Sequence, residues 1–287
     1  MSNALEIEGL SKAFRDFSLK DVAFSLPQGY IMGLVGENGA GKTTTIRLVL
    51  NMLSRDAGTV RVFGLDNIRD EQRIKQDVGV VFDEIFFVDS WRVSDVERAV
   101  KGFYSRWSGV AYGRYLKSFG LPAGKRVKEL SRGMKLKLML AVAMSHEARL
   151  LILDEPTSGL DPVARDELLG ILSAYISDGE KSVLFSTHIT SDLERISDFI
   201  TLIHNGAVFY TGTKDDLLES YRIVKGGPGD VTDRLRENMV GLQSNSAGFS
   251  GLVPASELKH PPRGIVMEAP SIDDILVRIS AGERDRE

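Results

Sequence analysis

The sequence predicts an α/β fold in which buried strands alternate with helices. Three apolar segments support this prediction. Residues 30–35 precede a glycine-rich stretch and a helical segment, Leu150–Leu153 ends in two carboxylates, and residues 182–185 lead to a lone histidine. Strands alternating with helices are typical of parallel sheets, in which ligands bind at the carboxyl ends of the strands. We therefore expect the functional residues at that edge of the sheet.

The composition excludes several classes of protein. With 287 residues, 43% hydrophobic and 26% charged, the chain can form one large or two modest soluble domains. A net charge of −4 gives no reason to expect nucleic acid as a partner, and the absence of cysteine excludes disulfides and thiolate metal sites. We expect neither a signal peptide nor a membrane span, because no apolar run approaches the roughly 18 residues that a span requires. At a membrane, another chain would have to supply the spanning part.

The glycine-rich segment Gly36–Thr43 matches the pattern G-x-x-x-x-G-K-[ST] between a strand and a helix. Its three glycines allow successive backbone N–H groups to face one concavity, and the following helix directs its positive end there. Lys42 is suited to the outer phosphates of a nucleotide and the Thr43 hydroxyl to Mg²⁺. The alternative is a turn that merely precedes a lysine. The motif alone does not separate kinases, GTPases and ATPases.

The pair Asp154-Glu155 ends the apolar segment at 150–153. The first carboxylate is suited to a Mg²⁺ shell, and the second can orient a water molecule and accept its proton. The alternative, two surface acids at a strand end, is disfavoured because the segment Pro156–Pro162 follows directly. His188 also ends a predicted strand, where α/β proteins bind ligands, although a lone histidine is usually structural.

The rest of the chain shows three further regions. Helical spacing indicates a helical insertion over about 84–147, and Asn205-Gly206 predicts a type I′ hairpin. The helix after the glycine-rich segment is expected to continue through Leu53. After Tyr221, a glycine-rich linker over 226–229 is expected to lead into a short helix, two strands, a last amphipathic helix and a solvated tail.

Taken in order, five segments resemble those of ATP-binding cassette (ABC) ATPases: Gly36–Thr43, Leu130–Met134, Leu150–Glu155, Ser158–Asp161 and His188. The resemblance covers roughly residues 4–220. It implies a P-loop NTPase of ABC type, with a RecA-like core, an antiparallel β subdomain and the helical insertion. The expected domains are a nucleotide-binding domain over 1–220 and a small α/β accessory domain with a tail over 221–287.

The resemblance also implies roles for individual residues. Lys42, Glu155 and His188 would be catalytic, with Glu155 as the base. Asp83 stands where the family usually has a glutamine, so it can approach Mg²⁺ but adds charge beside the phosphates. Phe14 would stack on adenine, unless it is a core residue. The residues expected to bind ATP are Phe14, Gly36, Asn38, Gly39, Gly41, Lys42, Thr43, Thr44, Ser131 and Gly133, and those expected to bind Mg²⁺ are Thr43, Asp154 and Asp83.

Two partners follow from the resemblance. Ser131 is a plausible helix N-cap, but in the family Ser131 and Gly133 would reach the ATP of a second subunit, so a homodimer around two ATP molecules is expected. A transmembrane permease subunit would dock near Phe86, Phe87 and Trp91, unless these aromatics pack within the insertion.

The chain most resembles the ATP-binding subunits of bacterial ABC-2 exporters of peptides and antimicrobial compounds, through its Val-Phe-Asp-Glu and Leu-Ser-Arg-Gly-Met-Lys segments. The expected function is ATP hydrolysis that drives transport through the permease, at the cytoplasmic face of the membrane. The alternative is a soluble ABC ATPase that is not coupled to transport.

Overall fold

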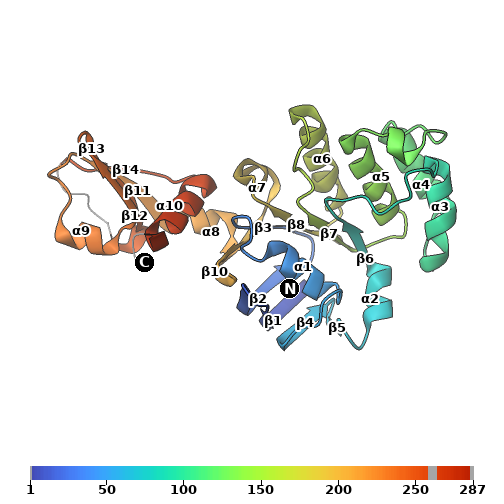
Figure 1. Ribbon diagram of the computed structural model, residues 1–287, viewed down its shortest axis with the longest axis horizontal. Coiled ribbons are helices and arrows are strands. Elements are labelled where there is room, and N and C mark those ends of the chain that lie inside the picture. The colour runs from blue at the N-terminus through green and yellow to red at the C-terminus, as the bar shows by residue number, and fades with distance from the viewer. Residues whose placement is uncertain (1, 258–263, 285–287) are drawn as a thin grey trace. The chain divides into compact units, whose positions relative to one another are not determined.

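The structure is a computed structural model that describes residues 2–257 and 264–284 (Figure 1). The chain forms two compact units. The first comprises the residues up to Asp192 together with Ile196–Thr211, and the second comprises Leu193–Arg195 and the residues from Gly212 onward. Within the described residues, no helix has both the length and the apolar character needed to cross a membrane. The solvated tail was predicted over 282–287, but the last helix continues to Arg284, so the prediction is wrong for its first three residues; residues 285–287 lie outside the described residues.

The first unit is built on a six-stranded sheet with the order β10-β9-β3-β8-β7-β6. β3 pairs in parallel with β8 and β9, and β7 with β6 and β8. Asn205 and Gly206 have φ values of 46° and 77°, which confirms the predicted type I′ hairpin between β9 and β10. The strands are β3 (Ile31–Val35), β6 (Val78–Val81), β7 (Leu150–Asp154), β8 (Ser182–Thr187), β9 (Phe199–His204) and β10 (Ala207–Thr213).

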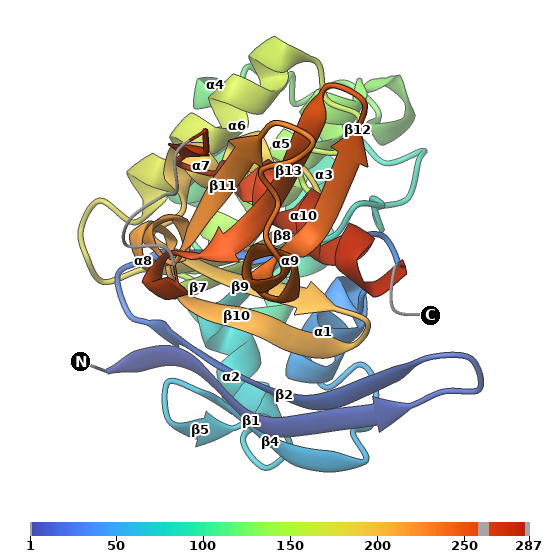
Figure 2. The same cartoon turned by 90° about the vertical axis from the view of Figure 1, so that its left-hand side faces the viewer.

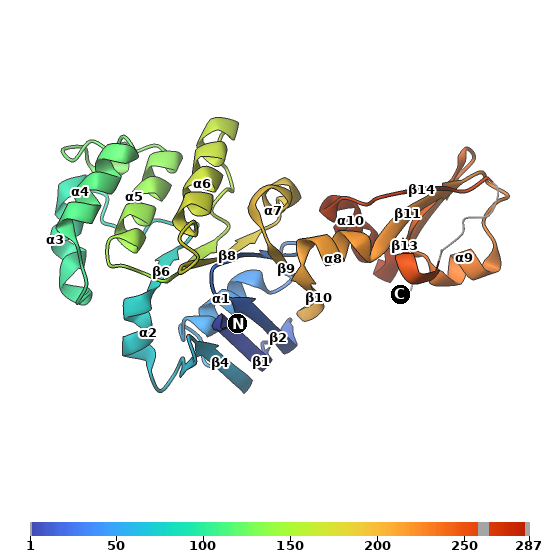
Figure 3. The same cartoon turned by 180° about the vertical axis from the view of Figure 1, so that it is seen from behind.

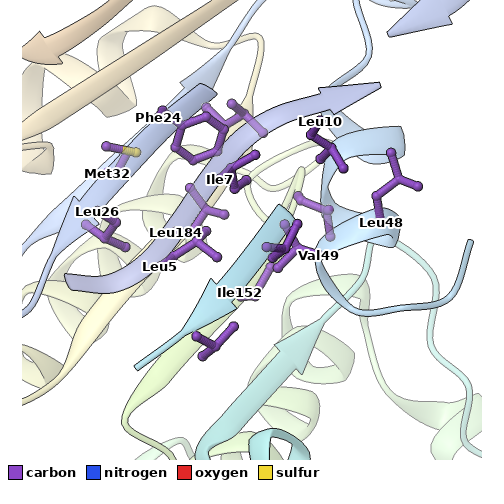
Figure 4. Close-up of a cluster of buried hydrophobic side chains, with 14 of the residues drawn as sticks. Leu5, Ile7, Leu10, Phe24, Leu26, Met32, Leu48, Val49, Ile152 and Leu184 are labelled. Atoms are coloured by element: carbon purple, nitrogen blue, oxygen red, sulfur yellow. The ribbon is translucent and has the colours of Figure 1, made fainter. Parts of the chain in front are cut away.

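A second sheet of the first unit has the order β2-β1-β4-β5, and its neighbouring strands pair antiparallel (Figure 2). Its apolar side chains pack with those of α1 and the central sheet into one core, which includes Leu5, Leu48 and Ile152 (Figure 4). This core fixes the position of α1 relative to β7, and therefore of the loops at their ends. The strands are β1 (Asn3–Ala13), β2 (Ser18–Pro27), β4 (Ala57–Val62) and β5 (Leu65–Asp66).

The helices that connect the strands of the core follow local sequence signals. The Asp161 carboxylate caps α6 by accepting hydrogen bonds from the N–H groups of Val163 and Ala164. α1 ends at Val49, so the prediction that it continues through Leu53 is wrong: Asn51 adopts φ 53°, a left-handed conformation that terminates helices. The helices are α1 (Lys42–Val49), α2 (Glu71–Asp77), α6 (Pro162–Tyr175) and α7 (Thr190–Ile196).

The helical insertion lies at one end of the first unit (Figure 3). It has its own apolar core, in which Val96, Tyr112 and Leu138 are buried. The Tyr112 hydroxyl donates a hydrogen bond to the carbonyl of Val93 at 2.9 Å and so ties two of the helices together. The helical elements are α3 (Val93–Val100), η1 (Lys101–Phe103), α4 (Gly109–Ser118), η2 (Val127–Glu129) and α5 (Arg132–Met144).

The second unit contains a four-stranded sheet with the order β12-β13-β11-β14. The prediction of two strands and a linker over 226–229 missed β11 and β12. β11 is a central strand that pairs with both β13 and β14. Its buried Ile223 and Val224 have the branched side chains that favour such a strand. The elements are α8 (Lys214–Glu219), β11 (Tyr221–Gly226), α9 (Asp233–Asn238), β12 (Val240–Asn245), β13 (Gly248–Pro254), η3 (Ala255–Glu257), β14 (Val266–Glu268) and α10 (Ile272–Arg284).

Candidate active site

The loop between β3 and α1 adopts a conformation that its glycines require. Gly41 has φ 115°, and a Cβ atom there would lie 2.9 Å from Leu19 Cδ1. At Gly36, a Cβ atom would lie 2.2 Å from the carbonyl oxygen of Ile203. Larger residues at these two positions would therefore open the loop. Of the other residues expected to contact phosphate, Asn38 is exposed on the loop, and Thr44 is half-buried in the first turn of α1.

Lys42 begins α1, and its side chain is only 5% exposed. Its Nζ atom donates hydrogen bonds to the carbonyl oxygens of Gly36 at 2.8 Å and Glu37 at 3.2 Å. The same atom lies 3.1 Å from Oε1 of Glu155. The ammonium group is thus held inside the curve of the loop and faces the end of β7.

The two carboxylates at the end of β7 have different surroundings. Asp154 is buried and accepts hydrogen bonds from Ser186 Oγ at 2.6 Å and Thr43 Oγ1 at 3.1 Å. Glu155 is a non-glycine residue with φ 49°, a left-handed conformation that costs free energy and is often found at functional sites. Its Oε2 atom hydrogen-bonds to Nδ1 of His188 at 2.7 Å. Glu155 therefore joins the lysine of the loop to the histidine after β8.

Thr43 and Asp154 have a donor set that fits a divalent cation. Both offer oxygen atoms, which are the preferred ligands of Mg²⁺. Within residues 2–257 and 264–284, the buried Asp154 carboxylate has hydroxyl donors but no ion pair, so its charge lacks a counterion. Asp83, the third residue expected to bind Mg²⁺, forms an ion pair with Arg132 instead of joining these two.

Ser186 is a site residue that the sequence interpretation missed. Its hydroxyl donates to Asp154 and accepts a hydrogen bond from the backbone N–H of Glu155 at 2.9 Å. β7 and β8 pair in parallel with Asp154 opposite Ser186, which places the hydroxyl between the two acidic residues. The sequence did contain a signal for Ser186, since it is a polar residue at the end of the predicted strand that leads to His188.

Phe14 lies in the connection between β1 and β2 and is 44% exposed, so the alternative that it is a core residue is wrong. It lines a cavity of about 450 Å³ together with Phe17, Gly39 and Asn205. The aromatic ring and the glycine-rich loop thus border one space.

Ser131 caps α5, as predicted, because its hydroxyl accepts a hydrogen bond from the N–H of Met134 at 3.3 Å. Ser131 is exposed and Gly133 half-buried. In the described part of the chain, no hydrogen bond or ion pair joins either residue to Lys42 or Glu155. By contrast, hydrogen bonds and ion pairs within one subunit join Thr43 to Asp154 and join Glu155 to both Lys42 and His188.

The geometry defines a P-loop nucleoside triphosphatase: a glycine-rich loop with an inward lysine, an oxygen pair suited to Mg²⁺ and a carboxylate suited to accept a proton from water. Comparison with known proteins narrows the class. The sequence profile of the ABC transporter family matches residues 19–158. The ABC transporter ATP-binding protein NatA of Bacillus subtilis is 30% identical over 211 residues, which cover 71% of this chain and 85% of NatA.

Two more relatives and two solved structures agree. YtrB of Bacillus subtilis, also an ABC transporter ATP-binding protein, is 28% identical over 88% of this chain and 87% of its own. The bacitracin transport ATP-binding protein BcrA of Enterococcus faecalis is 33% identical over 72% of this chain and 68% of its own. A solved ATP-binding subunit of an ABC transporter matches with a TM-score of 0.68 at 29% identity, over 75% of this chain and 91% of its own. CbiO1 of Clostridium perfringens shares the fold. Its structure matches with a TM-score of 0.64 at 22% identity, over 76% of this chain and 91% of its own.

The chain therefore belongs to the ATP-binding subunits of ABC transporters. This confirms the predicted P-loop NTPase fold of ABC type. The protein is an ATPase that hydrolyses ATP to power transport, and such subunits work with membrane permease components.

Proposed function

We propose that the first unit binds Mg²⁺–ATP between the Gly36–Gly41 loop and the carboxyl ends of β7 and β8, and that Glu155 is the catalytic base. The observation that carries this proposal is the placement of the Glu155 carboxylate between Lys42 Nζ and His188 Nδ1, at 3.1 and 2.7 Å. A carboxylate in this position can accept the proton of an attacking water molecule. His188 holds the carboxylate in place and faces the γ-phosphate.

The same cluster accounts for the binding of the phosphates. Lys42 and the backbone N–H groups around Gly39 and Gly41 hold the phosphates, and Thr44 supports them from the first turn of α1. Thr43 and Asp154 hold Mg²⁺, which neutralises charge on the phosphates when it is bound. Asp83 is an additional carboxylate at the edge of the site.

The cavity beside Phe14 is the proposed site of the adenine base. Its 450 Å³ opens between the exposed ring and Gly39, so a base stacked on Phe14 would leave its phosphates at the loop. An aromatic ring binds a nucleobase through its π face and needs no hydroxyl group. The 44% exposure of Phe14 supports this role, because an exposed ring is accessible to a ligand.

A second copy of the chain is proposed to complete the site. The exposed Ser131 and the half-buried Gly133 lie at the start of α5, and among the residues that the structure describes no hydrogen bond or ion pair joins them to Lys42 or Glu155. Their N–H groups and the Ser131 hydroxyl are suited to a phosphate, which helix N-termini attract. We infer a homodimer with two ATP molecules at its interface, in which Asp161 lies near the contact.

The permease subunit is proposed to dock in an apolar groove of the first unit. The groove has a volume of about 670 Å³ between α2, η1 and the strands of the core. Phe103 and Met52 line it and are 75% and 55% exposed. Phe86 is 71% exposed beside it and packs edge-on against Phe82, whereas Phe87 and Trp91 pack in the core of the insertion. Exposed apolar side chains around a groove are typical of a surface that receives a partner helix.

The transported compounds are proposed to be peptides or antimicrobial compounds that leave the cell. The names of the relatives support this, since BcrA acts in bacitracin transport and another relative, YbhF of Escherichia coli, is a probable multidrug ABC transporter ATP-binding protein. On this proposal the nucleotide-binding domain (1–220) works at the cytoplasmic face of the membrane through the permease. Residues 221–287 form an accessory domain.

Substitution of the base tests the catalytic and the dimer proposals together. We expect Glu155→Gln to lower ATP turnover by a factor of about 10² or more and to retain ATP, so that the protein becomes a dimer with Mg²⁺–ATP but not with ADP. Light scattering after gel filtration measures the mass, and the Lys42→Ala/Glu155→Gln protein is the control that should stay monomeric. A Glu155→Gln protein that binds ATP but stays monomeric would refute the dimer. One that retains normal turnover would refute the assignment of the base.

A further inference from the structure

Asp83 and Arg132 form an ion pair that joins two separate parts of the first unit. Asp83 follows β6 in the core, and Arg132 is the first residue of α5 in the helical insertion. Both side chains are about half exposed, at 49% and 50%. An ion pair with this exposure contributes little to the stability of the fold, so its position rather than its strength indicates its role.

The position of the pair is close to the catalytic base. Asp83, Arg132 and Glu155 line the same cavity of about 490 Å³. The Arg132 guanidinium also lies against the loop that follows Glu155, since a Cβ atom built on Gly159 would be 3.1 Å from Arg132 Nε. Asp83 therefore lines the same cavity as Glu155. The Oε1 atom of Glu155 in turn contacts Lys42 of the phosphate loop.

Two carboxylates, Asp154 and Glu155, lie at the proposed phosphate site, and a third, Asp83, lines the same cavity as Glu155. Glu155 has Lys42 and His188 beside it, and Asp154 is proposed to bind Mg²⁺. A polyphosphate bound beside Glu155 would be repelled by the Asp83 carboxylate if that charge were not offset, because like charges repel. Arg132 is the cation that contacts it.

We propose that Arg132 is a positioning residue for ATP binding within its own subunit. It holds the Asp83 carboxylate against the start of α5 and offsets its charge, so that the phosphates of ATP can approach Glu155 and Lys42. This inference rests on the proposed function of the Lys42–Glu155 site. It assigns a joint role to the aspartate after β6 and the arginine that begins α5.

A double-mutant cycle tests this proposal through the affinity for a non-hydrolysable ATP analogue with Mg²⁺, measured by calorimetry. We expect Arg132→Gln to weaken binding about five-fold at low salt, and less at high salt because the repulsion is screened. The matched control is Lys135→Gln, which removes the same charge from the same cavity but not the partner of Asp83. In an Asp83→Asn background, Arg132→Gln should change the affinity by less than two-fold.

The outcomes separate this inference from the proposed function. Equal effects of Arg132→Gln and Lys135→Gln would overturn it, as would a five-fold loss that persists unchanged in the Asp83→Asn background. If Arg132→Gln does not fold, Asp83→Asn alone decides: unchanged or tighter binding supports the inference, and weaker binding refutes it, because it would place Asp83 among the ligands of Mg²⁺. A wild-type protein that binds no analogue, or a Lys42→Ala protein that binds normally, would refute the proposed site instead.

Discussion

The Glu155 carboxylate is shared between two groups, with Oε1 at 3.1 Å from Nζ of Lys42 and Oε2 at 2.7 Å from Nδ1 of His188. The two contacts use both oxygens, so the carboxylate cannot turn without losing one of them. Residues that act as one unit show non-additive effects when they are substituted together. This arrangement therefore predicts how the catalytic effects of Glu155 and His188 combine.

Glu155→Gln and His188→Ala are each expected to lower kcat, by factors of about 10² to 10⁴ for the base and less for the histidine that orients it. His188→Ala should lower kcat much less in the Glu155→Gln protein than in the wild type, because the histidine then has no carboxylate left to orient. Steady-state ATPase assays give kcat for all three proteins, and ATP binding confirms that each has folded. If the two losses multiply in the double variant, His188 acts independently of Glu155.

Ser186 connects the two acidic residues and provides a second prediction. Ser186→Ala would leave the Glu155 N–H without a partner and remove one of the two donors to Asp154. Loss of a partner from a buried polar group costs about 1–3 kcal/mol, so we expect the free energy of unfolding to fall by that amount and ATP turnover to fall with it.

Ser182→Ala is the matched control for this prediction. Ser182 is buried at the other end of β8 and accepts a hydrogen bond from the N–H of Gly29 at 3.0 Å. Its loss should lower stability by a similar amount but leave ATP turnover per folded molecule unchanged. Denaturant unfolding and ATPase assays on both variants make the comparison. Equal losses of turnover would show that Ser186 acts only through stability.

The sequence predicted that Asp154, Glu155 and His188 lie at one edge of the sheet because its signals are local. Asp154, Glu155 and His188 each end an apolar strand, and the carboxyl ends of parallel strands meet at one edge. The pairing of Asp83 with Arg132 could not be predicted, because it depends on the packing of the insertion against the core and joins residues far apart in the chain. The missed β11 shows the same limit, since its partners β13 and β14 follow much later in the sequence.

The apolar groove predicts which surface changes disrupt coupling to the permease. Phe103→Glu places a charge in the groove, and we expect the variant to lose co-purification with the permease from detergent-solubilised membranes. Its ATPase activity without the permease should remain, because the groove that Phe103 lines does not include Lys42, Glu155 or His188. Val110→Glu is the control, since Val110 is 87% exposed on α4 and lines a different cavity. Equal loss of the permease with both variants would refute the groove as the docking site.

His146 predicts a pH dependence of stability. It is 1% exposed and stacks on Tyr104, with ring centroids 3.9 Å apart. Burial lowers the pKa of His146 below its usual value of 6.5, and the neighbouring Arg106 lowers it further, although backbone contacts to Val78 and Val142 and the charge of Asp77 oppose this. The unfolded chain thus binds a proton at a pH at which the folded protein does not.

The sign of the effect follows from this difference. Where the unfolded state binds more protons, stability rises with pH, so the contribution of His146 is present above pH 6.5 and is lost as the pH falls below it. The slope cannot exceed about 1.4 kcal/mol per pH unit for one group. Denaturant unfolding between pH 7.5 and 5 should show that the free energy of unfolding of the wild-type protein falls as the pH is lowered. The fall should be smaller for His146→Gln. The substitution itself lowers stability at every pH, so the slope and not the absolute value is decisive. Parallel curves for the two proteins would assign the acid sensitivity of the fold to other groups.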